Sequence, residues 1–182
     1  PWTILQPAPG YEAWIETEKT RLLPEGTPLP GSQIARLSTF ANSRSVSLEV
    51  GTSERLPFKI TVDADLRRVR LLVFGATSNT DWIEQDPDDQ MIETVSWTQT
   101  VPQAYQVDIT LRDRLWGYDA RYREQTLVIE FLKPPVVDSQ LYGLTIAVDA
   151  GHSADPGAVG PTGLVEKDAN LRIALALKTA LE

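Results

Sequence analysis

Apolar and polar residues alternate with a period of two along the middle of the chain. In "LPFKITVD" (56–63), Phe58, Ile60 and Val62 alternate with polar side chains, and "SVSLEV" (45–50) alternates in the same way. Four further stretches are typical of strands: "RRVRLLVFG", "MIETVSWTQ", "AYQVDITLR" and "TLVIEFLK". Turn signals such as "EQDPDDQ" and "RLWGYDARYRE" separate them. This pattern predicts a mainly β fold, with an antiparallel β-sandwich over residues 40–135.

The N-terminal segment 1–39 is expected to be rich in loops. Its stretches "QPAPG" and "RLLPEGTPLPGS" carry five prolines and three glycines, which interrupt regular structure. Only "YEAWIE", between them, is expected to form a short strand. In the β-domain that follows, the inward-facing positions predict the core. The side chains expected to contribute much of it are Phe58, Ile60, Leu71, Val73, Val107, Ile109, Leu127 and Ile129.

The pattern changes after "KPPVVDSQLYG", where residues 136–143 are expected to form a linker. "LTIAVDA" (144–150) is nearly all apolar, which is typical of a strand buried on both faces. "KDANLRIALALKTALE" then places Ile173, Ala174, Leu177 and Leu181 on one helical face. Residues 144–182 therefore read as the first β-α unit of an α/β domain. Such a unit cannot bury its own faces, and the chain opens without a methionine, so we expect a piece of a longer protein.

Composition narrows the class of protein. The formal net charge of −8 argues against nucleic acid as the main partner. No apolar run approaches the roughly 18 residues that a transmembrane helix needs. The opening "PWTILQPAPG" lacks the basic start and apolar stretch of a signal peptide. The absence of cysteine excludes disulfides and thiol chemistry.

The loop between the predicted strand and helix carries the candidate chemistry. His152, the only histidine, lies in "AGHSADPGAVGPTG", which has four glycines and two prolines, and Glu166 follows where the helix begins. Imidazole and carboxylate both suit zinc, and a catalytic zinc typically keeps three protein ligands and one open position. Two other interpretations stay open at this point: a surface histidine, and a glutamate that complements the helix dipole. The glycines match neither the Walker A pattern nor the dinucleotide fingerprint.

Residues 145–182 resemble the start of the catalytic domain of the zinc-dependent N-acetylmuramoyl-L-alanine amidases. In that family a strand ends in Asp-Pro-Gly-His-Gly-Gly, followed by Asp-Pro-Gly-Ala, Gly-Leu-x-Glu-Lys and a helix. This chain has "DAGH" (149–152), "DPGA" (155–158) and "GLVEK" (163–167) in the same order, continuing into Asn170 and Leu171. Ala150 replaces the proline, and Ser153 and Ala154 replace the two glycines. These departures affect the loop geometry and leave both ligand types in place.

By this resemblance, His152 and Glu166 correspond to the family's first two zinc ligands. The third ligand, a histidine, and the catalytic glutamate lie further along the family's domain, and this chain has no second histidine. We therefore expect no catalytic residue within residues 1–182, and no activity from the chain alone. The implied activity of the complete protein is hydrolysis of the amide between N-acetylmuramic acid and L-alanine in peptidoglycan. The implied location is extracytoplasmic, in the periplasm or cell envelope.

The β-domain resembles, in architecture and position, the AMIN-type targeting modules that often precede such catalytic domains. Its candidate wall-binding side chains are Trp116 and Tyr118, in a glycine-containing turn, because sugar rings stack on aromatic faces. The alternative is a structural role, since aromatic residues often fill cores; for Trp97, within a strand, that role is favoured. Two other functions stay open: a non-catalytic envelope module that carries an amidase remnant, and an unrelated α/β hydrolase or phosphate-binding protein.

Overall fold

The computed structural model describes residues 1–135 and 144–182, and the chain divides into two compact units, Pro1–Pro134 and Pro135–Glu182. The linker expected at 136–143 lies outside the described residues. The first unit is built of strands, and the second contains the helix α1 (Glu166–Leu181). Among the described residues, no helix is long and apolar enough to cross a membrane.

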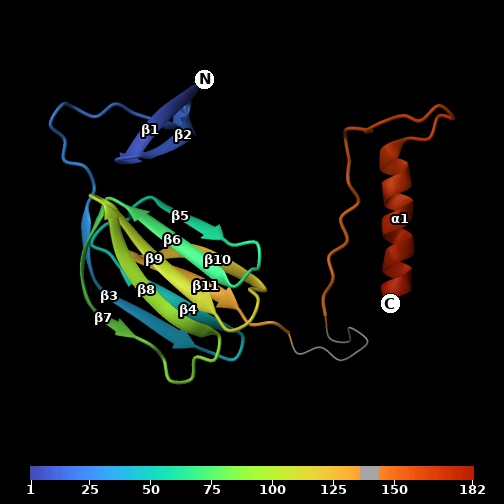
Figure 1. Cartoon of the computed structure of the whole chain (residues 1–182). Helices are drawn as coiled ribbons and strands as arrows, with labels where there is room; N and C mark the ends of the chain where they lie inside the picture. The colour runs from blue at the N-terminus through green and yellow to red at the C-terminus, as the bar shows by residue number, and fades with distance from the viewer. Residues whose placement is uncertain (136–143) are drawn as a thin grey trace. The chain divides into compact units, whose positions relative to one another are not determined.

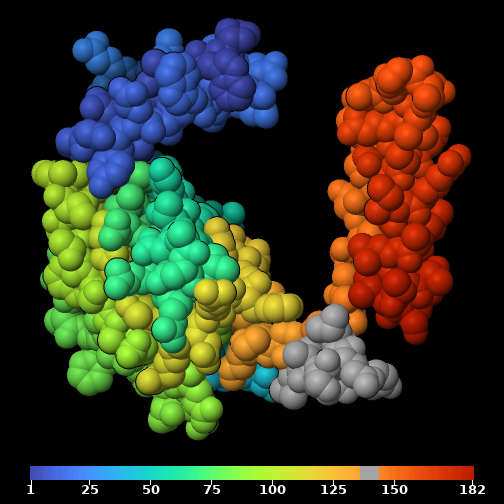
Figure 2. Space-filling view, turned by 45° about the vertical axis from the view of Figure 1, so that its right-hand side comes forward, coloured from blue at the N-terminus to red at the C-terminus, as the bar shows by residue number. Residues whose placement is uncertain are grey.

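The strands of the first unit confirm the mainly β prediction (Figure 1). They are β1 (Trp2–Ala8), β2 (Tyr11–Glu16), β3 (Ser32–Ala41), β4 (Ser45–Gly51), β5 (Phe58–Val62), β6 (Arg68–Phe74), β7 (Ala76–Glu84), β8 (Ile92–Val101), β9 (Ala104–Leu111), β10 (Gly117–Arg123) and β11 (Thr126–Leu132). β1 and β2 form a hairpin, followed by a short 3-10 helix, Thr17–Lys19. The hairpin (blue) lies at one end of this unit in Figures 1 and 2.

The remaining strands form two sheets. One has four antiparallel strands in the order β5-β6-β9-β8, and the other has five in the order β10-β11-β4-β3-β7. One cluster of buried side chains draws on both, including Leu71 of β6 and Val107 of β9 from the first sheet, and Leu48 of β4 and Phe131 of β11 from the second. The two sheets therefore bury their apolar side chains in a common core.

The predicted core is confirmed at most positions. Six of its eight members are at most 1% exposed: Leu71, Val73, Val107, Ile109, Leu127 and Ile129. The other two, Phe58 and Ile60, are partly buried and pack against the same cluster, because they lie on β5, an edge strand. The ring of Trp97 stacks on Tyr105 at a centroid distance of 5.7 Å and packs against the core, which supports a structural role for Trp97.

A buried hydrogen-bond chain joins the two sheets. The hydroxyl of Thr80 on β7 donates to the carbonyl of Ile34 on β3 at 2.6 Å. That hydroxyl lies 2.7 Å from the hydroxyl of Tyr105 on β9, from which it accepts. Burial raises the pKa of Tyr105 to about 12, so this phenol keeps its proton at neutral pH. These hydrogen bonds pair the buried hydroxyls of Thr80 and Tyr105 and the carbonyl of Ile34, which come from strands of both sheets.

The N-terminal segment holds more strand than expected. The strand predicted at "YEAWIE" is confirmed as β2, but β1 and most of β3 also fall within residues 1–39. The period-two pattern did not predict β3, because the pairing of β3 with β7 shifts register between Ile34 and Arg36. That irregularity leaves Ile34 and Leu37 both buried although they are three residues apart.

The expectation of purely antiparallel pairing is wrong for one pair, since β3 and β7 are parallel. The chain reaches β7 directly from β6, and Gly75 is the single residue between these strands, which belong to different sheets. Gly75 has φ +80°, and a Cβ there would lie 2.8 Å from the carbonyl oxygen of Pro30. Because β7 enters its sheet from the other sheet, no hairpin forces it to run antiparallel to β3.

The stretch "RLWGYDARYRE", expected to be a turn, contains the strand β10. Tyr118 and Tyr122 lie opposite Phe131 and Leu127 of β11, two core residues. Tyr122 also accepts a hydrogen bond from the N–H of Leu56 and donates one to its carbonyl, both at 2.9 Å. Charged residues between the tyrosines made an edge strand look like a turn.

In the second unit, the helix prediction is confirmed, whereas the strand predicted at residues 144–150 is not formed. Residues 144–150 form no strand, and Ile146 and Val148 are exposed. A strand forms only when a neighbour pairs with its N–H and C=O groups, and among the described residues none does so here. Helix α1 likewise has no buried residue, and Ile173 and Leu177, on its predicted apolar face, are exposed.

Candidate metal site

A compact loop places Glu166 beside His152. The loop folds back on itself through an isolated bridge between Val159 and Val165. The backbone N–H of Glu166 then donates to the carbonyl of Ala158 at 2.9 Å, which fixes the first residue of α1 against the loop. On the other side, the side chain of Asn170 donates to the carbonyl of Gly151 at 3.2 Å. The helix start and both arms of the loop are therefore held together.

The two predicted ligands point at each other. Nε2 of His152 lies 3.3 Å from Oε1 of Glu166. The other oxygen of Glu166 accepts a hydrogen bond from the backbone N–H of Ala158 at 2.8 Å, so one oxygen is anchored and the other faces the imidazole. His152 has φ +67°, in the left-handed region that few residues other than glycine adopt. An uncommon backbone conformation at this residue is consistent with a functional constraint.

Gly157 makes room for this pair. It has φ +69°, and a Cβ there would lie 2.7 Å from Oε2 of Glu166 and 2.9 Å from Nε2 of His152. Real Cβ atoms are essentially never found so close to other heavy atoms. Glycine is therefore required at this position for two reasons, its backbone conformation and the space that the two functional groups occupy.

The local environment keeps the carboxylate ionised. The backbone N–H of Ala158 and then the neighbouring imidazole of His152 hold the pKa of Glu166 below its usual value. The side chains of His152 and Glu166 are 31% and 42% exposed, so an ion from solvent can reach them. An anionic oxygen and an accessible imidazole nitrogen are the states in which these groups bind a metal.

The separation of these atoms fits two ligands of one zinc ion. Two ligands at about 2.0–2.1 Å from a tetrahedral zinc lie about 3.3–3.4 Å apart. A protonated imidazole donating to the carboxylate gives a similar distance, so a binding measurement has to separate the two cases. Within residues 1–135 and 144–182, no group of three or more His, Cys, Asp or Glu side chains is placed to hold a metal. The described residues thus offer two ligands, and a catalytic zinc typically takes three.

The candidate wall-binding residues belong to the other unit and are exposed. Trp116 directly precedes the edge strand β10 and is 59% exposed, whereas Tyr118, within that strand, is 41% exposed. Both present aromatic surface to solvent at the edge of the five-stranded sheet. Their role in binding stays a prediction.

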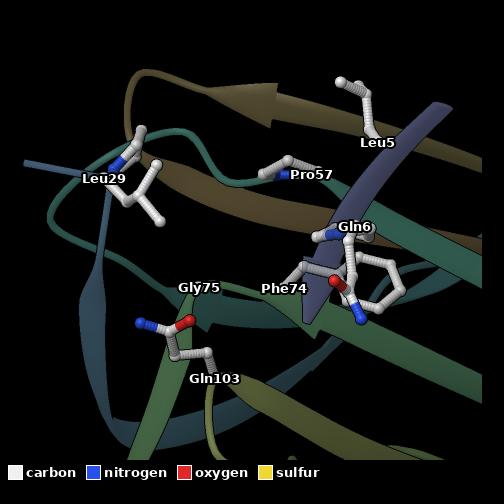
Figure 3. Close-up of a pocket in the computed structure, with 9 residues that line it drawn as sticks. Leu5, Gln6, Leu29, Pro57, Phe74, Gly75 and Gln103 are labelled. Carbon is white, nitrogen blue, oxygen red and sulfur yellow. The ribbon is translucent and has the colours of Figure 1, made fainter. Parts of the chain in front are cut away.

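An apolar cavity that the sequence did not indicate lies in the first unit (Figure 3). It has a volume of about 250 Å³ and is lined by residues of β1, of the segments before β3 and β5, of the end of β6 with Gly75, and of the β8–β9 turn: Leu5, Gln6, Pro7, Leu29, Pro30, Pro57, Phe74, Gly75 and Gln103. None of these side chains titrates, so the cavity offers surface for binding and no acid–base group.

Comparison with models of known protein families gives no match for this chain. A search of curated proteins gives no match either.

Replacing Gly157 with alanine should weaken zinc binding by about 10-fold or more, the scale on which changes around a metal ligand act. The new methyl group would displace Glu166 or His152. The matched control is Gly163→Ala, because Gly163 has a similar φ of +81° and nothing within 4 Å of its Cβ position. Zinc affinity measured by competition with a chelating indicator compares the two, and an equal loss in both variants would refute the steric argument.

Proposed function

We propose that this chain belongs to a zinc-dependent N-acetylmuramoyl-L-alanine amidase and supplies two of its zinc ligands, His152 and Glu166. The observation that carries the proposal is the 3.3 Å approach of Nε2 of His152 to Oε1 of Glu166. It is supported by the ordered match of the three motifs in residues 149–167 to the amidase pattern. Glu166 at the start of α1, Gly157 and His152 lie close together, as residues of a metal-binding site must.

The substrate of this proposed activity is the amide that joins the lactyl group of N-acetylmuramic acid to L-alanine. When bound, zinc would polarise the carbonyl of this amide and lower the pKa of a water molecule. The residues of this chain would hold and orient the metal: His152 would supply the ring nitrogen Nε2, and Glu166 a carboxylate that the N–H of Ala158 keeps in place. The third ligand and the group that moves the proton to the leaving amine are proposed to lie outside residues 1–182.

The exposed apolar surface of residues 144–182 supports a larger catalytic domain. Ile146, Ile173 and Leu177 are between 46% and 66% exposed, although their sequence pattern is that of core positions. In the proposed complete domain, further strands and helices pair with residues 144–150 and cover the apolar face of α1. The α/β amidase unit thus remains part of the proposal.

For the first unit we propose an AMIN-like β-sandwich that targets the protein to peptidoglycan in the periplasm or cell envelope. The common core of its two sheets supports the sandwich. Trp116 and Tyr118, exposed at the edge of the five-stranded sheet, are the proposed contacts to sugar rings. The acidic net charge of −8 is compatible with an uncharged glycan as the ligand.

The test uses the natural protein in full. The purified protein is incubated with isolated peptidoglycan, and the digestion products are analysed. We expect about one zinc per protein by elemental analysis. We also expect, by mass spectrometry, stem peptides with a free N-terminal L-alanine beside glycan strands with intact lactyl groups. The 182-residue chain serves as the control and should release nothing. Cleavage of glycosidic or peptide bonds, or a protein free of zinc, would refute the amidase. Zinc-free binding to peptidoglycan would favour the non-catalytic envelope module.

A further inference from the structure

The imidazole of His152 has a second carboxylate on its other nitrogen. Nδ1 lies 3.5 Å from Oδ2 of Asp155, on the side of the ring away from Glu166. This distance is at the outer limit of a hydrogen bond, and such contacts at functional sites are often long until the ligand is bound. The ring is thus placed between two acidic side chains, one facing each nitrogen.

We propose that Asp155 is a positioning residue that favours the tautomer of His152 with the proton on Nδ1, the form whose Nε2 can bind a metal. An ionised carboxylate can only accept hydrogen bonds, so Asp155 favours a proton on Nδ1, while Glu166, 3.3 Å from Nε2, favours a proton there. A metal bound to Nε2 takes the lone pair of that atom and leaves the proton on Nδ1, beside Asp155. Metal-bound histidines generally use their second nitrogen in this way. The inference rests on the proposed function, because the ion in question is the zinc of that site.

The two carboxylate oxygens of Asp155 contact different groups. Oδ1 accepts a hydrogen bond from the backbone N–H of Gly157 at 3.0 Å, and Oδ2 faces the imidazole. The Gly157 bond first, and then His152, hold the pKa of Asp155 below its usual value, so the group is an anion. A purely structural role, closing the turn that leads to Gly157, needs only Oδ1. The positioning role needs a second acceptor atom on the same side chain.

This division makes Asp155→Asn a sharp test. The amide oxygen of asparagine can keep the bond from Gly157, and its NH₂ group then faces Nδ1 as a donor. A donor at Nδ1 requires a lone pair there and moves the proton to Nε2, the atom that has to bind the metal. A merely structural residue would be replaced by asparagine without any change of tautomer.

The experiment uses the 182-residue chain, in which His152 is the sole histidine and gives one set of imidazole signals. Proton–nitrogen correlation spectra at alkaline pH, where imidazole is neutral, report which nitrogen is protonated. Zinc ions alone are then titrated against a chelating indicator. In the neutral imidazole, we expect a larger share of the Nδ1–H tautomer in the original chain than in Asp155→Asn, where Nε2–H should predominate. We also expect zinc affinity to fall about 10- to 100-fold, as for other groups that orient a ligand. Asp168→Asn, with the same change of charge in the first turn of α1, should match the original chain.

Two results would overturn the proposal: a share of the Nδ1–H tautomer that is the same in the original chain and in Asp155→Asn, or an unchanged zinc affinity in Asp155→Asn. Asp155→Ala provides a second measurement, since it removes both acceptor atoms and should also lower the share of the Nδ1–H tautomer. If the tautomer switches as expected but no chain binds zinc, the contact between Asp155 and His152 is supported and the metal site of the proposed function fails.

Discussion

Replacing His152 with alanine should abolish turnover by the natural protein and remove its zinc. The imidazole is one of the two proposed ligand groups that the described residues bring together, and its Nε2 lies 3.3 Å from the other. Altering a group that merely orients a ligand costs about 10- to 100-fold in metal affinity, so loss of the ligand itself should cost more. Because a metal ligand acts on the reacting centre, the substitution should lower kcat sharply and should not raise KM.

Glu166→Gln should lower zinc affinity by a similar amount, since it keeps the shape of the side chain and removes its charge. The control is Lys167→Ala, at the next position, whose backbone N–H bonds to the carbonyl of Pro156 in either variant. Elemental analysis and amidase rates on the same preparations measure both effects. A full equivalent of zinc and unchanged turnover in both ligand variants would show that the amidase motif does not carry its function at these positions.

Replacing Phe131 with alanine should destabilise the β-rich unit by about 3–5 kcal/mol, the usual cost of removing a buried aromatic ring. Phe131 is 0% exposed and lies in β11 between Val46 of β4 and Tyr118 of β10. Its loss would leave a cavity in the core that both sheets share. Urea unfolding of the 182-residue chain, followed by far-UV circular dichroism at a wavelength where strands dominate, measures the change.

The control for that experiment is the next residue. Leu132 is 41% exposed because successive side chains of a strand point to opposite faces. Leu132→Ala should therefore cost no more than about 0.5 kcal/mol, as at other surface positions. Equal losses at the two positions would contradict the register of β11, since a slip by one residue exchanges the buried and exposed faces.

The sequence predicted the two candidate ligands, but not the arrangement of the other residues around them. The resemblance of the motifs around His152 and Glu166 to the amidase pattern predicted two ligands, whereas their spacing alone did not. Nothing in the sequence indicated that Asp155 faces the opposite nitrogen of the imidazole, or that Gly157 has no room for a Cβ. The space at Gly157 is taken because the loop folds back through the Val159–Val165 bridge, a contact across five intervening residues, and brings Glu166 beside it. Side chains that meet because a loop folds back leave no periodic signal.

By itself, the sequence determined where most strands lie and which side chains form the core, because burial on one face of a strand imposes a period of two. It also determined the helix, predicted over 167–182 and observed as Glu166–Leu181. Tertiary structure alone decided the parallel pairing of β3 with β7 and the strand character of β10. It also decided that residues 144–150 form no strand with any of the described residues. In each of these cases the outcome depends on whether a partner strand is present. Hydrogen bonding between strands is a property of two segments, and the pattern of one segment does not contain the other.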